Sequence, residues 1–429
     1  MYNSSMKKIE PKTLKGFRDF LPLEARKRQY VINTLKSVFE LYGFEPLETP
    51  VLEYEEILTG KYGDEGDKLM YRFEDNGKRR VAMRYDQTVP LARVVAQYQN
   101  QLAFPFKRYQ VQNVWRAENT QKGRYREFIQ CDMDTVGVDS PLADAEIITA
   151  AAKAYQNLGF KNFKIVINDR IIFSDLVTSR QVIEEKDLPM VVRCLDKLKK
   201  IGREKVLEEM VKNGLTTEQS TDILQTIEMQ KPTERLTQIM KALEDVGLDQ
   251  SVMTFSPTLA RGLDYYTGMI FEIESEEYPY GSLCGGGRYN ELIGMFAGKD
   301  IPAVGLAVGF DRTIEAMEAL NLFPAEINNA VTQILITVFS EELKDKALQI
   351  ASQFRLNKIA TEIYLGEIKE KNALEKQLKY ADAKNIPLVL FAGPQELEKN
   401  IVTLRDMKTR EQQSGTLEEI IKICISLNQ

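Results

Sequence analysis

The chain has 429 residues, of which 43% are hydrophobic and 28% are charged, and its formal net charge is −6. This length predicts two or three domains, and the acidic balance argues against a general nucleic-acid coat protein. No run of about 18 apolar residues is present, so we expect no membrane contact. The first residues lack an apolar signal core and an Arg-rich transit pattern, which favours the cytoplasm.

The sequence contains no histidine, and its four cysteines are Cys131, Cys194, Cys284 and Cys424. Pairs of a serine or cysteine nucleophile with histidine are therefore excluded, as is a histidine-ligated metal. The cysteines lack the spacing of zinc ligands, so we expect no protein-bound metal. Any chemistry must use carboxylates, arginines, lysines, tyrosines and backbone dipoles.

The first part of the chain predicts a helix followed by several strands. Apolar residues recur at helical spacing over 22–42, and Gly43 can end that helix. Residues 44–52 look extended, but Pro46 and Pro50 favour a sheet edge or an interface over a central strand. Further strands are expected over 81–85, 106–117, 128–137 and 164–168, and a helix over 144–158.

The composition changes after residue 169. Lys/Glu-rich helical segments fill 170–247 and predict an inserted helical module in a first domain made of 1–169 and 248–323. Residues 324–330 form a linker, and strands alternate with helices over 331–429. That alternation predicts a small α/β domain with a mostly parallel sheet. In the first domain, strands return at 253, 269–275 and 303–308, and a helix follows over 309–320.

The two strands expected on either side of residue 120 flank a basic loop. Residues 107–127 contain two glutamates and six basic residues, Lys107, Arg108, Arg116, Lys122, Arg124 and Arg126. Guanidinium groups bind phosphate oxygens bidentately, so Arg116 and this loop suit a polyphosphate. Phe128 could stack an adenine, and Glu118 could accept from its amine. The alternative is an exposed hairpin with ordinary cross-strand charge pairs.

Several segments, in order, resemble the class II aminoacyl-tRNA synthetases. The segments that resemble motifs 1, 2 and 3 are the first helix with Thr49-Pro50, 115–118 (WRAE) with 124–128 (RYREF), and 305–312 (GLAVGFDR). Two segments resemble the signature peptides of the histidyl-tRNA synthetase family, 261–267 (RGLDYYT) and 284–289 (CGGGRY). Residues 84–93 (RYDQTVPLAR) also match that family, and 331–429 resembles the class IIa anticodon-binding domain.

The resemblance implies a fold and a reaction. The fold is an α+β catalytic domain with a mixed, mainly antiparallel sheet that carries a helical insertion, plus a C-terminal α/β anticodon-binding domain. The implied enzyme is a homodimer. With Mg²⁺ present, the carboxylate of L-histidine attacks the α-phosphate of ATP, and the 3′ end of the histidine tRNA then takes the histidyl group.

The resemblance also assigns residues to the amino acid. It implies that the Asp86-Gln87-Thr88 segment holds the ammonium group and that Gln130, Gly285 and Gly286 lie against the substrate. Asp134, Tyr265 and Tyr266 would surround the imidazole, whose N–H and acceptor nitrogen an aspartate and a phenol can satisfy. From the residues alone, Asp134 could instead be a strand-edge carboxylate that caps a turn. The glycines could be a plain tight turn.

A second set of residues is assigned to ATP and tRNA. The implied ATP ligands are Arg116, Glu118, Arg124, Phe128 and Arg312. The implied catalytic residues are Arg116 and Arg261, and Arg261 would face the charge that develops on the α-phosphate. Gln121 and Lys122 would contact the tRNA acceptor end. Taken alone, Arg261 would suit a surface ion pair.

Three other functions stay open at this point. The regulatory subunit of ATP phosphoribosyltransferase in histidine biosynthesis resembles the same catalytic domain. It lacks the anticodon domain, and its signature peptides are typically degraded. This chain has a segment that resembles the anticodon domain and segments that resemble both signature peptides. A catalytically inactive RNA-binding protein and a class IIa ligase for another amino acid are the remaining alternatives, and the bacterial or archaeal-type branch also stays open.

Overall fold

The computed structural model describes residues 9–61, 63–120, 125–178, 182–261, 265–368 and 372–427. The chain divides into two compact units, Met1–Phe323 and Pro324–Gln429. Within the described residues, no helix combines the length and the apolar character needed to cross a bilayer.

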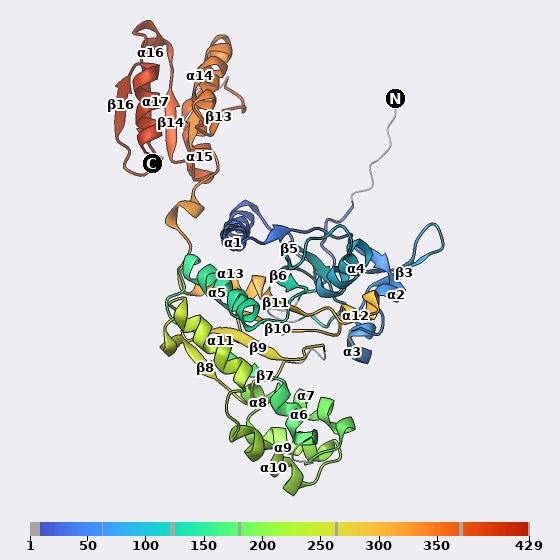
Figure 1. Ribbon diagram of the computed structural model, residues 1–429. Helices are drawn as coiled ribbons and strands as arrows, with labels where there is room; N and C mark the ends of the chain where they lie inside the picture. Colours follow the sequence, from blue (N-terminus) through green and yellow to red (C-terminus); the bar gives the residue numbers. More distant parts are fainter. Residues whose placement is uncertain are drawn as a thin grey trace. The chain divides into compact units, whose positions relative to one another are not determined.

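An eight-stranded sheet forms the centre of the first unit (Figure 1), with the strand order β1-β5-β6-β11-β10-β9-β7-β8. Its strands are β1 (Glu45–Pro46), β5 (Phe106–Trp115), β6 (Glu127–Val136), β7 (Phe163–Asp169), β8 (Met253–Phe255), β9 (Met269–Ser275), β10 (Cys284–Arg288) and β11 (Ala303–Val308). The two outermost pairings are parallel and the other five are antiparallel. The predicted mixed, mainly antiparallel sheet is confirmed, and the proline-containing β1 lies at its edge as expected.

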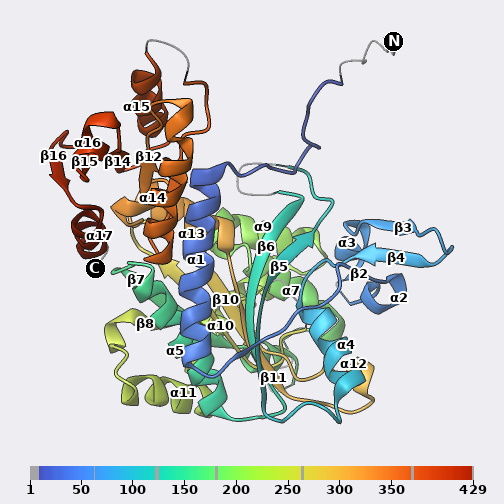
Figure 2. The same ribbon diagram turned by 90° about the horizontal axis from the view of Figure 1, so that it is seen from above.

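The two faces of β5 and β6 differ in chemistry because side chains alternate along a strand. Tyr109, Cys131 and Met133 belong to a buried apolar core. Residues of α1 (Pro22–Leu41), α5 (Pro141–Asn157) and α13 (Phe310–Ala319) complete this core, and Figure 2 shows these helices grouped over the sheet. The opposite face of the same two strands carries charged side chains, including the buried Arg108 and Asp134.

The glycine run of the second signature peptide forms β10, between β9 and β11. A tight turn there, one of the two readings of the sequence, is wrong. A Cβ atom on Gly286 would lie 2.1 Å from the carbonyl oxygen of Gly305, and one on Gly287 would lie 2.6 Å from that of Met269. Glycine is thus required because the neighbouring backbones approach too closely for a side chain.

A smaller sheet and the start of a helix lie next to the main sheet. Strands β2 (Leu52–Tyr54), β4 (Arg80–Met83) and β3 (Arg72–Glu74) pair antiparallel in that order. The chain then enters α4 (Thr88–Tyr98). Two short helices, α2 (Glu55–Leu58) and α3 (Gly63–Lys68), precede β3, and α12 (Gly294–Ala297) follows β10.

Helices fill most of the region between β7 and β8. They are α6 (Ile171–Thr178), α7 (Leu188–Leu195), α8 (Leu198–Ile201), α9 (Arg203–Lys212), α10 (Thr217–Glu228) and α11 (Glu234–Asp245). Residues of α6, α7, α9 and α10 share an apolar core of their own, whereas Leu236, Ile239 and Leu243 of α11 belong to the main core. The predicted domain limits stay a prediction.

The second unit is the predicted α/β domain, but its sheet is evenly mixed. The strand order is β13 (Thr361–Ile363), β12 (Ile334–Ile336), β14 (Leu388–Phe391), β15 (Val402–Asp406), β16 (Gln412–Gly415). The first two pairings are parallel and the last two antiparallel, so the predicted mostly parallel sheet is wrong. The sequence of β16 is polar and lacks a strand pattern, which is why it was not predicted. The helices are α14 (Lys344–Leu356), α15 (Ala373–Ala383), α16 (Pro394–Glu398) and α17 (Leu417–Ser426).

Candidate functional site

The floor of the candidate site is the face of β6 that carries Gln130, Asp132 and Asp134. These side chains point the same way because they are two residues apart on one strand. Asp134 lies directly opposite Gly305 of β11. A Cβ atom on Gly305 would lie 1.8 Å from Oδ1 of Asp134. Glycine at position 305 therefore makes the room that this carboxylate occupies.

Asp134 is buried and has two partners of different kinds. Nη2 of Arg108, on the neighbouring strand β5, lies 2.7 Å from its Oδ2. The Tyr289 hydroxyl donates a hydrogen bond to its Oδ1. Burial raises the pKa of Asp134, and the Arg108 guanidinium opposes that shift. Asp134 is thus a buried carboxylate in the sheet, and the alternative of a turn-capping edge residue is wrong.

Three tyrosines pack against one another beside Asp134. The ring centroids of Tyr265 and Tyr266 are 4.9 Å apart, and those of Tyr265 and Tyr289 are 5.8 Å apart. Burial raises the pKa of all three hydroxyls. These hydroxyls consequently keep their protons at neutral pH and can serve as hydrogen-bond donors as well as acceptors.

The Asp86-Gln87-Thr88 segment leads into α4 beside the same floor. The Asp86 carboxylate accepts a hydrogen bond from the backbone N–H of Val89 (3.2 Å), in the first turn of α4. The Gln87 amide nitrogen donates to the backbone oxygens of Gln112 (2.9 Å) and Gln130 (3.2 Å). Gln87 thereby ties the segment to both β5 and β6.

Asp132 is the site residue that sequence reasoning missed. Its side chain is 2% exposed, and burial raises its pKa well above its usual range. Three buried oxygens, Oε1 of Gln87, Oε1 of Gln130 and Oδ1 of Asp132, have no hydrogen-bond partner among the residues that the structure describes. The two-residue spacing of Gln130, Asp132 and Asp134 was the available signal, because it places all three on one face of a strand.

The arginine expected to bind ATP lies at the end of β5. Nε of Arg116 donates to the backbone oxygen of Tyr85 at 3.2 Å. Its guanidinium carbon lies 4.4 Å from the Tyr85 ring centroid and 5.2 Å from that of Phe128. Arg116 and Phe128 therefore lie together, and Arg116 contacts Tyr85, the residue directly before Asp86. The backbone oxygen of Glu118 accepts from Nε of Arg126 (3.0 Å).

Three residues of the predicted site lie outside the described residues, and these are Gln121, Lys122 and Arg124.

Arg261 lies against the glycine strand β10. Its Nη1 donates to a carboxylate oxygen of Glu272 at 3.0 Å. A Cβ atom on Gly285, which is paired with Glu272, would lie 1.6 Å from that same Nη1. The ion pair expected from the residue alone is present, but it is largely buried, with about a fifth of each side chain exposed. The guanidinium carbon lies 6.0 Å from the Tyr266 ring centroid, which places Arg261 beside the tyrosines.

Arg312 approaches the site from the start of α13. Its Nη1 donates to the backbone oxygen of Ser282 (2.7 Å), in the turn that joins β9 to β10. A Cβ atom on Gly281 would lie 3.2 Å from Nη1 of Arg312. The structure therefore places Arg312 at the end of the glycine strand.

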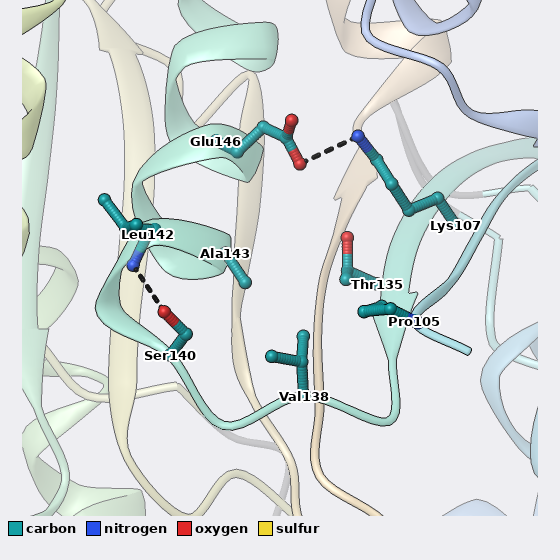
Figure 3. Close-up of a pocket in the computed structure, with 8 residues that line it drawn as sticks. All are labelled: Pro105, Lys107, Thr135, Val138, Ser140, Leu142, Ala143 and Glu146. Atoms are coloured by element: carbon teal, nitrogen blue, oxygen red, sulfur yellow. Dashed lines mark hydrogen bonds and ion pairs between the residues drawn. The ribbon is translucent and has the colours of Figure 1, made fainter.

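A separate pocket opens on the other face of the sheet (Figure 3). Lys107 and Thr135 line it, and their side chains alternate with those of Arg108 and Asp134. Its volume is about 260 Å³, and Nζ of Lys107 lies 2.9 Å from the Glu146 carboxylate. This pocket contains none of the predicted site residues, so it is not the candidate site.

The described residues contain no group of three or more Cys, Asp or Glu side chains arranged to hold a metal ion. Three carboxylates lie near the floor, those of Asp86, Asp132 and Asp134. Arg108 forms an ion pair with Asp134. Such a site suits an organic cation better than a protein-bound metal.

Comparison with known proteins gives a consistent result. Residues 16–313 match the family model described as histidyl-tRNA synthetase, and residues 333–427 match the anticodon binding domain. A histidine–tRNA ligase of Rhodopirellula baltica is 41% identical over 94% of this chain and 95% of its own length. A histidine–tRNA ligase of Cytophaga hutchinsonii is 38% identical over 96% of this chain and 99% of its own.

Solved structures agree with these relatives. The histidyl-tRNA synthetase of a Nostoc species has a TM-score of 0.82 and 30% identity, covering 97% of this chain and 100% of that one. A Bacillus halodurans structure described as an ATP phosphoribosyltransferase regulatory subunit/histidyl-tRNA synthetase has a TM-score of 0.71 and 25% identity. It covers 86% of this chain.

Proposed function

The chain belongs to the histidyl-tRNA synthetase family, and from this membership we propose how its site performs the family's reaction. The function is the ligation of histidine to tRNA with ATP as the energy source. The amino acid lies on the β6 face, between the tyrosines and the start of α4. ATP lies next to it, between Arg116 and Arg261.

The observation that carries the assignment is the group of unpartnered buried acceptors. Oε1 of Gln87, Oε1 of Gln130 and Oδ1 of Asp132 all lack a donor among the described residues. A buried acceptor without a donor costs roughly 1–3 kcal/mol. The α-ammonium group of an amino acid has three N–H donors and a positive charge, so it would satisfy these oxygens. Asp86 and Thr88 stand at the same end of the site.

The side chain of the substrate would lie against Asp134. This carboxylate is already oriented by Arg108 and Tyr289, so it can accept an imidazole N–H without rearranging. A tyrosine hydroxyl of Tyr265 or Tyr266 would donate to the second ring nitrogen. A side chain without both nitrogens would leave buried polar groups unpaired, which is the strong form of substrate discrimination.

ATP would lie with its adenine against Phe128 and its phosphates near arginines. Arg116 would bind the phosphates, with Arg124 and Arg312, and Glu118 would accept from the adenine amine. Arg261 would stabilise the charge that develops on the α-phosphate as the histidine carboxylate attacks. Gly285 leaves the space that the Arg261 guanidinium occupies, and we propose that the backbone of Gly285 and Gly286 lies against the substrate. We propose that ATP enters as its Mg²⁺ complex, with the metal held by the phosphates.

The second step requires the tRNA, whose 3′-terminal ribose hydroxyl attacks the carbonyl of the adenylate. We propose that Gln121 and Lys122 contact the acceptor end. The C-terminal domain, 331–429, would bind the anticodon, since it matches that domain family. The helices of 170–247 would form an insertion into a catalytic domain of 1–169 and 248–323, with 324–330 as the linker.

We propose that the active form is a homodimer. Strand β1 forms one edge of the main sheet and pairs only with β5 among the described residues, and exposed apolar side chains lie nearby along the chain. They are Leu41, Val51, Leu52 and Tyr54. An open edge with exposed apolar side chains marks an interface. Light scattering after size exclusion should give twice the mass of the chain.

We also propose that the protein works in the cytoplasm. All four cysteines are free and buried, as is usual in a reducing compartment.

Charging of a histidine tRNA transcript by the purified full-length chain tests the proposed roles. Arg116→Ala and Arg261→Ala should each slow the activation step by roughly 10²–10³-fold, the usual cost of removing one charge-stabilising group. Histidine affinity should change much less. A wild-type rate in Arg261→Ala would overturn its assignment. Charging by wild type also separates this function from that of a regulatory subunit, which does no aminoacylation.

A further inference from the structure

The segment before α1 is a part of the N-terminal sequence that the proposed roles do not use. Residues 14–20 (LKGFRDF) form no helix or strand of their own. Figure 2 shows this dark-blue segment running beside the end of the β5–β6 hairpin. We propose that Arg18 is a positioning residue that joins the motif 2 and motif 3 sides of the ATP site. This inference rests on the proposed ATP site.

The first contacts of the segment are with the motif 2 hairpin. The backbone oxygen of Gly16 accepts from the N–H of Arg126 at 2.8 Å. Gly16 has φ +90°, and a Cβ atom there would lie 2.7 Å from the Arg126 side chain and 2.8 Å from that of Thr120. The segment thus packs against both ends of the loop that joins β5 to β6. Only glycine combines this close approach with a positive φ.

Arg18 continues the contact two residues later. Its guanidinium carbon lies 3.2 Å from the ring centroid of Tyr125, which stands next to Arg126. It also lies 4.9 Å from the ring of Phe20. A guanidinium plane stacks on an aromatic face, whereas a lysine ammonium offers only a point charge. Arg18 therefore fixes the position of Tyr125, just before the chain enters β6.

The other side of Arg18 contacts motif 3. Its Nη2 lies 2.9 Å from Oδ2 of Asp311, and Nη1 of Arg28 lies 2.6 Å from Oδ1 of the same carboxylate. The guanidinium carbon of Arg28 also lies 3.8 Å from the Phe20 ring centroid. Asp311 directly precedes Arg312, the motif 3 arginine assigned to ATP. One carboxylate is thus held by two arginines at the start of α13.

These contacts make one chain from the motif 2 hairpin to the motif 3 helix. Arg116 and Phe128 are on the hairpin, and Arg312 is on the helix. Binding one polyphosphate with arginines from both elements requires a fixed separation between them, because a misplacement of about 1 Å can cost roughly 10²-fold. Arg18 sets that separation without touching the histidine floor.

The test compares ligand affinities of full-length variants. Arg18→Met should weaken ATP binding, measured by calorimetry, by about tenfold and raise the ATP KM to match, whereas the histidine Kd should stay within about twofold. Arg18→Lys should not restore ATP affinity, because it keeps the charge but not the plane. Lys27→Met is the matched control, since Lys27 pairs with Glu318 and lies over Phe323 instead. It should leave both affinities unchanged.

Two further variants keep the test independent of folding defects and of the proposed reaction. Tyr125→Leu removes the stacking partner and should reproduce the Arg18→Met effect. Asp311→Asn combined with Arg18→Met should be non-additive. An unchanged ATP Kd in folded Arg18→Met, or equal losses for ATP and histidine, would overturn the proposal. Calorimetry needs no turnover, so a wild type that binds ATP but activates no histidine would refute only the proposed function.

Discussion

Asp134 on β6 and Gly305 on β11 are direct partners in the main sheet, and the aspartate side chain occupies the space above the glycine. A sheet normally places two side chains at such a pair. Gly305 has no side chain, so the Asp134 carboxylate has room beside it and reaches both Arg108 and Tyr289. The pocket for the substrate side chain is therefore set by two strands together.

Gly305→Ala tests this relationship. The added methyl group would lie 1.8 Å from Oδ1 of Asp134, so the carboxylate must move away from Tyr289. We expect the histidine Kd to rise by roughly 10- to 100-fold, which corresponds to the loss of a buried charged hydrogen bond of about 1.5–3 kcal/mol. Gly268→Ala is the control, because its Cβ would meet Arg288 at an ordinary 3.6 Å. Equal histidine affinity in both variants would contradict the relationship.

Gly285→Ala should act through Arg261. The new Cβ would occupy the position of the Arg261 guanidinium, 1.6 Å from Nη1. The rate of adenylate formation should fall by roughly 10²–10³-fold, as measured by single-turnover quench flow. Combined with Arg261→Ala, the glycine change should add little. Gly77→Ala, in the exposed turn between β3 and β4, is the control and should keep the wild-type rate. Fully additive effects of Gly285→Ala and Arg261→Ala in the double variant would disprove the coupling.

Asp132→Asn should stabilise the protein while it weakens histidine binding. Burial raises the folded-state pKa of Asp132, so folding disfavours its ionised form. This destabilisation is absent below the usual aspartate pKa and grows as pH rises toward the raised value. The variant should therefore gain free energy of unfolding relative to wild type as pH rises, in urea titrations. Asp222→Asn, exposed on α10, should show no such trend. A variant less stable than wild type at pH 8 would contradict the prediction.

Asp144→Asn should be strongly destabilising. This carboxylate is fully buried and binds two arginines, Arg288 (2.6 Å) and Arg235 (2.7 Å). The change leaves the buried Arg288 with only the half-exposed Asp139 carboxylate, 3.5 Å away, as a counter-charge, and breaking a buried ion pair costs roughly 3–5 kcal/mol. Thermal melting of the apo protein should show the loss. Lys241→Met, which removes an exposed pair with Asp245 on α11, should change the melting temperature little. A neutral Asp144→Asn would mean that Arg288 finds another partner.

The fold was predictable where residue pattern and packing agree. The apolar spacing of 22–42 predicted α1, and the two extended segments 106–117 and 128–137 on either side of a basic loop predicted the central hairpin. β10 was not recognised because its glycines have no side-chain pattern. Its pairing depends on the close approach of two other strands, and no local sequence rule reports that distance.

The site was predictable in its residues more than in its geometry. The basic residues of 107–127 do not act as one group, because Lys107 and Arg108 point to opposite faces of β5. Lys107 pairs with Glu146, while Arg108 is completely buried under Asp134. Asp132 was overlooked although it lies between two predicted residues. Its importance follows from burial and from the lack of a donor, and both depend on tertiary structure.

The most direct test of the account is amino-acid-dependent exchange between ATP and pyrophosphate by the purified full-length chain, without tRNA. We expect exchange with L-histidine and none above background with the other standard amino acids. Asp134→Ala should lose most of the histidine-dependent rate. Exchange with a different amino acid, or no exchange by a folded protein with Mg²⁺ present, would contradict a site that activates histidine.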